Sequence, residues 1–466
     1  MKKKLHFIIL FWALFFIELY GQKYHPWCYR TQDEYGKYMS RTVHKLTNST
    51  VNKPQIVNII IYGETLSKQN WTIILEDSLS ARYPSADVRL INKSIEGFSL
   101  ENLRKTLNFD IFPEYPDLVI FHANGPAFHY EKIIRMIRSR SSTEMLVWND
   151  PFMGEDQWSD TMSFHLIPRF CEENKVEFAN IRTSWSDYLK KHNLSSGSLL
   201  NQGNQQLNKK GNELLATLLL GYFKPVDLPD KNPYSLTDTL NLRFQEDVNR
   251  MDYYFEGNAV EVIMQDSIPE DQRFRILING YPPSTFQDGY FHSRPNHDKK
   301  INWPWETGTI YHLENHNELE EENWVLKLTS RDDSLNRFTF DLHGSVSGFD
   351  GAGTNKMTFV SNSGKIVIQP QDWFIKQAWD RTGIDIQPGY TIEWETYTHA
   401  NDYITSDFQG KKAWLVQGLR NGKHLLQIIS FGNYPVPIKK LLFINLTLTN
   451  ENEKFIFSDI RDTFFK

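Results

Sequence analysis

Between residues 50 and 222, short apolar runs alternate with amphipathic segments. The run at 56–62 (IVNIIIY) is almost continuously apolar and rich in β-branched residues, which is typical of a strand buried on both faces. Further strands are predicted at 86–92, 117–122, 144–149 and 176–180, and helices at 70–82, 99–107, 130–140, 163–174 and 208–222. Strands and helices alternating at this spacing predict an α/β domain, a parallel sheet with helices on both faces.

The pattern changes after a proline-rich segment at 225–235. Short runs of alternating apolar and polar residues follow, separated by Gly, Pro, Asn and Asp, at 259–264, 274–279, 323–329, 337–344, 365–370 and 390–397. This pattern predicts an all-β region, either one elaborate β-sandwich or two smaller ones. We therefore divide the chain into an α/β domain (50–223), a linker (224–236) and a β-rich region (237–466).

The first residues have the pattern of a targeting segment. Three lysines at 2–4 precede an apolar stretch at 5–20, and the small residue Gly21 follows. This order predicts a signal peptide over 1–21, followed by an N-terminal arm over 22–49. The apolar stretch is short for a membrane span, and no later stretch is long enough. We expect an exported protein, periplasmic or extracellular, without a membrane span.

The composition indicates which kinds of ligand the protein is expected to bind. The formal net charge is −6 and the pI is about 6.2, so nucleic acid is not an expected partner. Aromatic residues reach 14%, with 13 Trp and 21 Tyr, which suits stacking on sugar rings, although aromatic cores are the commoner explanation. No Cys/His cluster has zinc spacing and no phosphate-binding loop occurs, so no cofactor or metal is expected.

The two cysteines, Cys28 and Cys171, leave two alternatives open. In an oxidising compartment they would form one bridge between the N-terminal arm and the first domain. Otherwise they are two unrelated buried thiols.

The strand at 56–62 ends in Gly63, Glu64 and Thr65. Open α/β sheets place their chemistry at the carboxyl ends of the strands. A hydroxyl on the turn between a strand and a helix is a candidate nucleophile, as in serine hydrolases. Thr65 holds that place, with the carboxylate of Glu64 beside it.

Four blocks in chain order resemble an SGNH (GDSL-type) hydrolase. They are YGETLS (62–67), NKSIEGFS (92–99), PDLVIFHANG (116–125) and LNQGNQQLNKKGNELLA (200–216). The stretch SGFDGAGTNKMTFVSNSG (347–364) further resembles the C-terminal region of a secreted bacterial branch of that superfamily linked to polysaccharide metabolism. The resemblance implies a flavodoxin-like three-layer fold, and an esterase-type activity on a polysaccharide or oligosaccharide.

The catalytic positions depart from the family pattern. In the first block the family's Asp-Ser becomes Glu64-Thr65. In the last block its Asp-x-x-His is absent, and the histidine position falls on Gln205 or Gln206, neither of which accepts a proton at neutral pH. Without a general base, a neutral hydroxyl is not activated for acyl transfer. The triad expected from the resemblance is therefore degenerate.

Three readings remain open. In the first, the protein hydrolyses an ester or related side group with a rebuilt base, for which Glu64, His122 and His129 are candidates. In the second, the same cleft performs non-hydrolytic acid–base chemistry, an elimination or dehydration on uronic-acid oligosaccharides. In the third, the protein is a pseudoenzyme that binds a glycan without turning it over.

The catalytic set is thus Glu64, Thr65 and His122. Each has a simpler explanation: a helix cap for Glu64 and Thr65, and a core histidine for His122. The set predicted to bind substrate or an oxyanion comprises Gly63, Asn92, Gly97, Asn124, Asp150, Arg182 and Gln206. For Asp150 the alternative is a turn before proline, and for Arg182 a surface ion pair in place of a bidentate anion clamp.

Two features of the β-rich region are ambiguous. Trp303 and Trp305 are candidates for stacking on sugars; the favoured alternative is that they pack in a core. The segment 350–355 (DGAGTN) offers oxygen ligands around glycines, but it does not match the EF-hand pattern. A glycine-rich turn is the favoured explanation there.

Overall fold

The computed structural model describes residues 25–201, 206–225, 237–241, 249–286, 289–296, 319–398, 400–410, 412–416, 419, 422–432 and 434–444. The predicted signal peptide, most of the predicted linker, and Trp303, Trp305 and Gln205 lie outside these residues. By internal contacts the chain divides into two units, 1–100 with 116–135 and 143–235, and 101–115 with 136–142 and 236–466. Each unit is described by itself.

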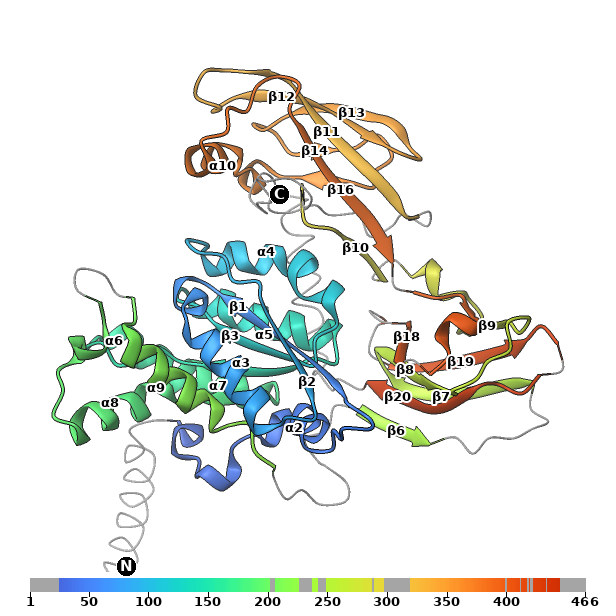
Figure 1. The fold of residues 1–466 in the computed structure, drawn as a ribbon. Coiled ribbons are helices and arrows are strands. Elements are labelled where there is room, and N and C mark those ends of the chain that lie inside the picture. The colour runs from blue at the N-terminus through green and yellow to red at the C-terminus, as the bar shows by residue number, and fades with distance from the viewer. Residues whose placement is uncertain are drawn as a thin grey trace, which may run out of the picture. The chain divides into compact units, whose positions relative to one another are not determined.

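The first unit is built on a parallel five-stranded sheet in the order β2-β1-β3-β4-β5 (Figure 1). Its strands are β1 (Ile56–Gly63), β2 (Asp87–Asn92), β3 (Leu118–His122), β4 (Glu144–Trp148) and β5 (Glu177–Ala179). This is the flavodoxin-like strand order, in which the chain reverses direction across the sheet beside β1. The predicted α/β class and parallel sheet are confirmed.

Helices cover both faces of this sheet. They are α2 (Ser40–Thr47), α3 (Trp71–Arg82), α5 (Ala127–Arg140), α6 (Gln157–Thr161), α7 (Ile167–Glu173), α8 (Ile181–Lys191) and α9 (Lys209–Leu220). A π-helical turn (Met162–Leu166) joins α6 to α7, so the predicted helix at 163–174 starts earlier and is irregular. Helix α4 (Leu100–Asp110) follows β2 in the chain. Its residues from Glu101 onward are assigned to the second unit.

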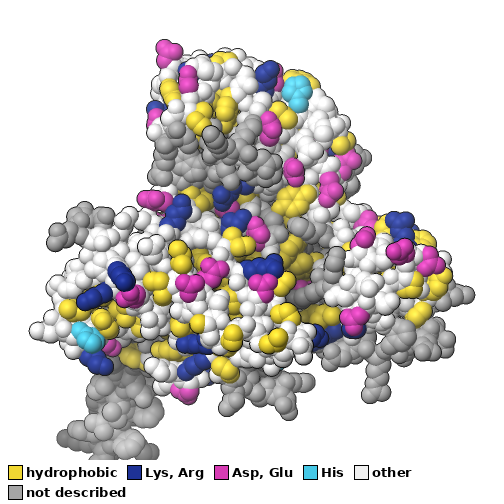
Figure 2. All heavy atoms as spheres, viewed as in Figure 1, with side chains coloured by type: hydrophobic (Ala, Val, Ile, Leu, Met, Phe, Trp, Pro, Cys, Tyr) yellow, Lys and Arg dark blue, Asp and Glu magenta, His cyan; other side chains and the backbone are white. Residues whose placement is uncertain are grey.

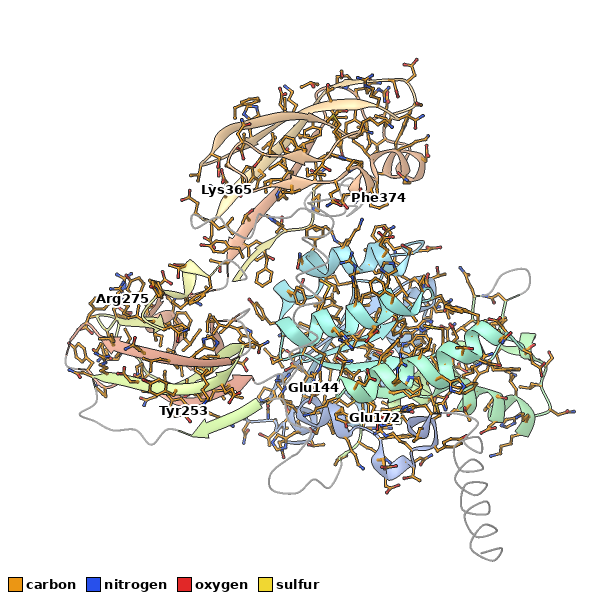
Figure 3. All side chains as sticks on the ribbon, turned by 180° about the vertical axis from the view of Figure 1, so that it is seen from behind. Glu144, Glu172, Tyr253, Arg275, Lys365 and Phe374 are labelled. Atoms are coloured by element: carbon orange, nitrogen blue, oxygen red, sulfur yellow. The ribbon has the colours of Figure 1, made fainter. Side chains whose placement is uncertain are left out.

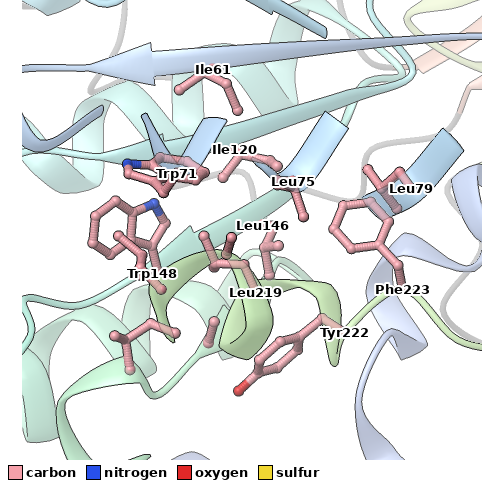
Figure 4. Packing of buried hydrophobic residues seen from close by; sticks show 14 of the residues in the cluster. Ile61, Trp71, Leu75, Leu79, Ile120, Leu146, Trp148, Leu219, Tyr222 and Phe223 are labelled. Atoms are coloured by element: carbon pink, nitrogen blue, oxygen red, sulfur yellow. The ribbon is translucent and has the colours of Figure 1, made fainter. Parts of the chain in front are cut away.

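The core on one face lies between the sheet and helices α3 and α9. Trp71 and Leu75 from α3 and Leu219 from α9 pack with Ile61, Ile120 and Leu146 of the strands (Figure 4). On the other face, Phe121 contacts Tyr130 of α5 at a ring-centroid distance of 4.9 Å. Because successive strand residues point to opposite faces, the apolar runs of β1, β3 and β4 are buried on both.

The N-terminal arm is fixed to the sheet by two buried carboxylates. Glu144 of β4 accepts hydrogen bonds from the backbone N–H of Arg41 (3.0 Å) and from the backbone N–H and hydroxyl of Thr42 (both 2.7 Å). Glu177 of β5 accepts from the backbone of Gly36 (3.1 Å) and Tyr38 (3.0 Å). The first turn of α2 therefore gains acceptors for backbone donors that a helix cannot satisfy within itself.

Cys28 and Cys171 are free thiols, so the second of the two alternatives for the cysteines holds. Cys171 is buried in α7, and the Cys28 sulfur lies 3.6 Å from the carbonyl oxygen of Phe164. Burial raises the pKa of Cys28 to about 12.

The second unit is rich in antiparallel β structure, as predicted. A five-stranded sheet, β10-β16-β11-β12-β13, has its own core, which includes Trp324, Phe340 and Trp394. Its strands are β10 (Tyr290–His292), β11 (Glu322–Arg331), β12 (Phe338–Gly344), β13 (Gly348–Thr354) and β16 (Thr391–Thr398), with a small ribbon β14 (Phe359–Val360) and β15 (Val367–Ile368) and helix α10 (Ile375–Thr382).

Two four-stranded sheets, β17-β9-β19-β7 and β18-β8-β20-β6, share a second core in this unit. Their strands are β6 (Thr237–Asn241), β7 (Arg250–Gly257), β8 (Ala259–Met264), β9 (Phe274–Ile278), β17 (Tyr403–Ile404), β18 (Lys412–Val416), β19 (Gly422–Ser430) and β20 (Ile438–Ile444). We refer to these two sheets as the sandwich. Of the alternatives left open for this region, the structure has two separate β cores.

Residues 350–354 lie in strand β13, so the favoured prediction of a glycine-rich turn at 350–355 is wrong. Asp350 is buried and accepts hydrogen bonds from the backbone N–H (2.7 Å) and hydroxyl (2.6 Å) of Ser363. These bonds occupy the carboxylate, so the segment ties β13 to the following loop. Within the described residues, no helix has the length and hydropathy that a bilayer span requires.

Candidate functional site

The site is built on the aligned carboxyl ends of β1 and β3. In the parallel register, Gly63 lies opposite His122. A side chain at Gly63 has no room, because a Cβ there would lie 1.8 Å from the carbonyl oxygen of His122 and 2.7 Å from the hydroxyl oxygen of Ser67. That hydroxyl donates to the same carbonyl at 3.3 Å. The glycine thus brings the turn at 64–67 close against the end of β3.

His122 ends β3 with 1% of its surface exposed, and its ring stacks on that of Trp148 at a centroid distance of 3.8 Å. Its Nδ1 lies 3.1 Å from the carbonyl oxygen of Trp148. A carbonyl only accepts, so Nδ1 carries a proton. Its Nε2 lies 3.1 Å from a carboxylate oxygen of Asp150, an ion-pair distance without the direction of a hydrogen bond. Both ring nitrogens therefore face oxygen acceptors.

The surroundings of His122 favour the imidazolium. Burial lowers its pKa, and this is the largest single effect. The carboxylate of Asp150, then that of Glu64, and the carbonyl of Trp148 act in the opposite direction, and together they raise the pKa of His122 above its ordinary value. His122 is a buried imidazole whose protonated form is stabilised by its two acidic neighbours. It is in the core, as its strand position indicated, and it also belongs to a charged cluster.

Asn124 joins the two carboxylates. Its backbone N–H donates a short hydrogen bond to Oε1 of Glu64. With its amide turned so that the nitrogen faces Asp150, that nitrogen lies 2.6 and 3.2 Å from the two carboxylate oxygens. We assign this orientation because the opposite one sets the amide oxygen against the carboxylate. Asn124 was predicted as an oxyanion donor, whereas here both of its donors hold acids.

Glu64 does not cap a helix. It sits at the N-cap position of a short 3-10 helix (Thr65–Lys68), but its side chain makes no capping hydrogen bond. Burial raises the pKa of Glu64, and the hydrogen bond from Asn124 and the charge of His122 offset this only in part. A carboxyl group in these surroundings keeps its proton to higher pH than a free glutamate. The simpler explanation of Glu64 as a cap is therefore wrong.

Thr65 begins the same 3-10 helix and is half-buried. None of the residues that the structure describes forms a hydrogen bond with its hydroxyl. A nucleophilic hydroxyl needs a base within hydrogen-bonding reach. The Thr65 hydroxyl is therefore not in an activated arrangement.

Asn92 and Gly97 form the turn that follows β2. The amide nitrogen of Asn92 donates to the carbonyl of Ser67 at 2.7 Å, and its oxygen accepts from the backbone N–H of Ser94 at 3.0 Å. Gly97 has φ 80°, a left-handed conformation that favours glycine. Both residues shape the loop beside the site, and the amide group of Asn92 is occupied in doing so.

Arg182 is buried and holds the loop that follows Asp150. Its guanidinium donates to Asp160 (2.9 Å) and to the carbonyls of Pro151 (3.3 Å) and Gly154 (3.1 Å). It also lies over the ring of Phe152. A ligand clamp needs free donors. Of the two roles weighed from the sequence, the structure has the ion pair, with Asp160 at 2.8 Å, but the arginine in it is buried, and Arg182 stabilises the loop that follows Asp150.

The two remaining candidates are less closely tied to the cluster. Gln206 is exposed, and its backbone carbonyl accepts from the N–H of Asn201 at 2.8 Å in the loop before α9. His129 lies in the first turn of α5, and its ring contacts that of Phe128.

Three residues around the site were not predicted. Ser67 and Trp148 contact His122 as described above. Tyr130 is fully buried, its hydroxyl has no partner among the described residues, and burial raises its pKa well above the ordinary value, with smaller effects from Cys171, Asp150 and Glu64. The position of Trp148 at the end of a predicted strand, two residues before Asp150, is the one signal that the sequence offered.

Electrostatically, the site is an acid–base cluster. It holds two carboxyl groups, Glu64 and Asp150, one buried imidazole, and an amide that bridges the acids. Among the described residues, no three His, Cys, Asp or Glu side chains are grouped so as to hold a metal ion. Proton transfer between groups of differing acidity is the chemistry that such an arrangement supports.

Comparisons with known proteins return structures only. A scan of protein-family models gives no match to the chain, and a search of curated proteins gives none either. A two-domain esterase active on acetylated mannans, crystallised with mannopentaose, is 10% identical, with 89% of this chain and 95% of that chain covered and a TM-score of 0.33. The acetyl xylan esterase AlAXEase is 15% identical, with 34% and 97% covered and a TM-score of 0.31.

A third structure, the lipase/acylhydrolase from Enterococcus faecalis, is 16% identical, with 36% of this chain and 93% of that chain covered and a TM-score of 0.30. At these values the likenesses do not assign chemistry to this chain.

Proposed function

We propose that the first unit hydrolyses an ester side group on a polysaccharide or oligosaccharide, and that two carboxyl groups, one acting as base on water and one as acid, replace an acyl nucleophile. One observation carries the proposal: Glu64 and Asp150 are held together by Asn124 and share the buried imidazole of His122. The carbohydrate class rests on the resemblance of 347–364 and of the four blocks to a polysaccharide-linked branch. Export through the predicted signal peptide is part of the same proposal.

The two carboxyl groups differ in their surroundings, which assigns their roles. Glu64 has a pKa raised by burial and is the acid. The Asp150 side chain is 24% exposed, lies 3.1 Å from the imidazole of His122, and is the base. His122 is too deeply buried to touch substrate and is a positioning residue. Its Nδ1 proton, fixed by the Trp148 carbonyl, leaves Nε2 facing the base.

The reaction balances without a covalent intermediate. The carboxylate of Asp150 takes a proton from water as the water oxygen bonds to the acyl carbon. The tetrahedral species then breaks its bond to the sugar oxygen, and that oxygen receives the proton of Glu64. Ester and water become carboxylic acid and alcohol, and the released acid ionises as the two carboxyl groups return to their starting states.

A second candidate uses the same pair. In an elimination on a uronic-acid residue, Asp150 would take the proton on the carbon next to the carboxylate, and Glu64 would protonate the departing oxygen. The observation that favours it is the unpartnered hydroxyl of Thr65, because elimination needs an acid and a base but no acyl nucleophile. A non-catalytic glycan-binding protein is the remaining alternative.

The test compares three variants on acetylated and on uronic-acid oligosaccharides, with mass spectrometry of the products. Asp150→Asn and Glu64→Gln should each lower kcat by roughly 10²–10⁴-fold, the usual contribution of general acid–base catalysis. The kcat of Thr65→Ala should stay within about tenfold of the wild-type value, because no base activates the Thr65 hydroxyl as a nucleophile. Glu155→Gln, an exposed acid in the loop after β4, is the matched control and should leave kcat unchanged.

Product masses separate the candidates. Loss of an acyl group, with heavy oxygen from labelled water in the released acid, supports hydrolysis. An unsaturated product without label supports elimination. Binding without any mass change refutes both. Loss of activity in Thr65→Ala, with retention in Thr65→Ser, would instead establish Thr65 as a nucleophile and overturn the proposed route.

A further inference from the structure

The outer face of one sandwich sheet, β17-β9-β19-β7, carries a group of side chains that the proposed reaction does not use. Along β9 and β19, residues alternate between the core and this face. Phe274, Ile276, Leu426 and Ile428 point into the core. Arg275, between Phe274 and Ile276, therefore points outward and is exposed. Arg275 and the inward Tyr253 of β7 are both labelled on the sandwich in Figure 3.

The strand register sets a row of outward residues across this sheet. Tyr403 of β17 pairs with Arg275 of β9, and Arg275 pairs with Ile429 of β19. Ile429 pairs in turn with Arg250 of β7. Residues directly opposite one another in antiparallel strands share a face. Tyr403, Arg275 and Ile429 are thus neighbours on the outer surface.

Two further residues extend this row at its Tyr403 end. The guanidinium of Arg273 lies over the ring of Tyr403, 4.1 Å from its centroid. The ring of Phe431, 63% exposed, lies 5.9 Å from that of Tyr403, and its backbone N–H donates to the carbonyl of Arg273 at 3.0 Å. We call Arg273, Arg275, Tyr403 and Phe431 the aromatic–arginine surface.

The charge of this surface is unbalanced. Neither Arg273 nor Arg275 forms an ion pair with an acid among the described residues, and Asp271, the nearest acid in sequence, is approached by the hydroxyl of Tyr434 at 3.2 Å. Arg250 on the same sheet differs, because both of its donor groups bind Asp252, at 2.9 and 3.0 Å. In the first unit, by contrast, acidic and basic side chains are interspersed on the face seen in Figure 2. Two unpaired arginines beside two aromatic rings call for an anionic partner with an apolar face.

We propose that the aromatic–arginine surface binds an acidic carbohydrate. A pyranose ring stacks its C–H face on the exposed ring of Phe431, beside Tyr403, and its carboxylate or sulfate is held by Arg273 and Arg275, whose planar donors suit such anions. Carboxylate and sulfate present the same chemistry to a guanidinium. The proposal goes beyond the reaction at Glu64 and Asp150, since it assigns a separate binding site to the second unit and requires no turnover.

Charge and shape together select this occupant. A protein partner of ordinary affinity buries roughly 800 Å² on each side, a far larger area than four side chains offer. A neutral sugar would use the two rings but leave both guanidinium groups without a partner. An acidic sugar matches the rings and the arginines at once, and its binding weakens as salt screens the charges.

The experiment measures binding by the full chain, using calorimetry with oligogalacturonate as the carboxylate probe, a carrageenan oligosaccharide as the sulfate probe and mannan oligosaccharide as the neutral one. The wild type should bind at least one acidic probe, more weakly as salt is raised, and the neutral probe poorly. Arg273→Gln with Arg275→Gln, and separately Phe431→Ala, should each weaken that binding by about tenfold or more.

Two matched variants on the same sheet serve as controls. Arg250→Gln removes an arginine already paired with Asp252, and Tyr254→Ala removes an aromatic residue that is 77% exposed. Both should bind as the wild type does. Equal binding of neutral and acidic probes, or wild-type affinity in the double arginine variant, overturns the proposal, as does failure to bind either acidic probe. Asp150→Asn should keep full binding, so a failed reaction and a failed surface are distinguishable.

Discussion

The charge state of His122 gives the sharpest test of the cluster. Asp150→Asn keeps the shape of the side chain and removes its charge. Burial is the largest effect on His122 and lowers its pKa, while Asp150 is the first of the groups that raise it. Once Asp150 is neutral, burial should prevail, and the pKa of His122 should fall below its wild-type value. At neutral pH the ring would then lose the proton on Nε2 and keep the one on Nδ1, which the Trp148 carbonyl accepts.

The stability change has a definite sign and size. A histidine whose folded pKa is raised adds stability that is fully present below its unfolded pKa, about 6.5, and is lost as pH rises through the folded value. Breaking a buried ion pair costs about 3–5 kcal/mol. Because Asp150 is 24% exposed and Asn keeps a polar head, we expect about 1–3 kcal/mol here at about pH 5.5, and less at an alkaline pH above the folded pKa of His122.

The assay combines two measurements. Urea unfolding of the wild type and of Asp150→Asn gives the difference in unfolding free energy at each pH, and NMR titration follows the His122 ring. Glu155→Gln, the exposed acid in the same loop, should change neither quantity. A penalty for Asp150→Asn that is equal at the two pH values, with the His122 titration unmoved, would refute the conclusion that Asp150 raises the pKa of His122.

Four further substitutions, at three positions, test the framework of the first unit. Gly63→Ala should destabilise the protein by about 3 kcal/mol or more in urea unfolding, because its Cβ would lie 1.8 Å from the carbonyl oxygen of His122; near-wild-type stability would contradict the close approach of β1 to β3. Glu144→Ala should cost about 2–4 kcal/mol by leaving the donors of Thr42 and Arg41 without their acceptor, and Glu144→Gln, which keeps one oxygen, clearly less. Arg182→Met should raise protease cleavage within the loop after β4 while circular dichroism stays unchanged.

The sheet was predictable because its signals are local. A strand buried on both faces is an unbroken apolar run, so β1 was predicted at 56–62 and found at Ile56–Gly63. The alternation of strands and helices then fixed the class, and the end of β1 marked an edge where Glu64, His122 and Asn124 do meet. Chain order and periodicity carry that much information without any knowledge of the tertiary contacts.

The predictions that were wrong concern side chains whose roles depend on contacts between distant segments of the chain. Arg182 follows a strand like many surface residues, and nothing in its neighbours shows that the loop carrying Pro151 and Gly154 folds over its guanidinium. Asn124 had the residue type of an oxyanion donor. Its two donors are taken by two acids, one that lies 60 residues before it and one that follows the neighbouring strand β4. Residue type alone does not indicate which partner a side chain will meet.

The departures from the SGNH pattern have a consistent physical meaning. In a Ser-His-Asp triad the serine hydroxyl is the nucleophile, and the histidine and aspartate activate it. Here the hydroxyl of Thr65 has no described partner, while the acid beside it is held by Asn124 and faces a second acid across His122. Replacing the family's Asp-Ser by Glu-Thr lengthens the acid by one methylene, and the longer side chain is the one that reaches the backbone of β3's end. Under the proposed function, a pair of proton-transfer groups stands at this sheet edge in place of the nucleophile that the resemblance implies. Reactions that need only an acid and a base are therefore the ones to assay first.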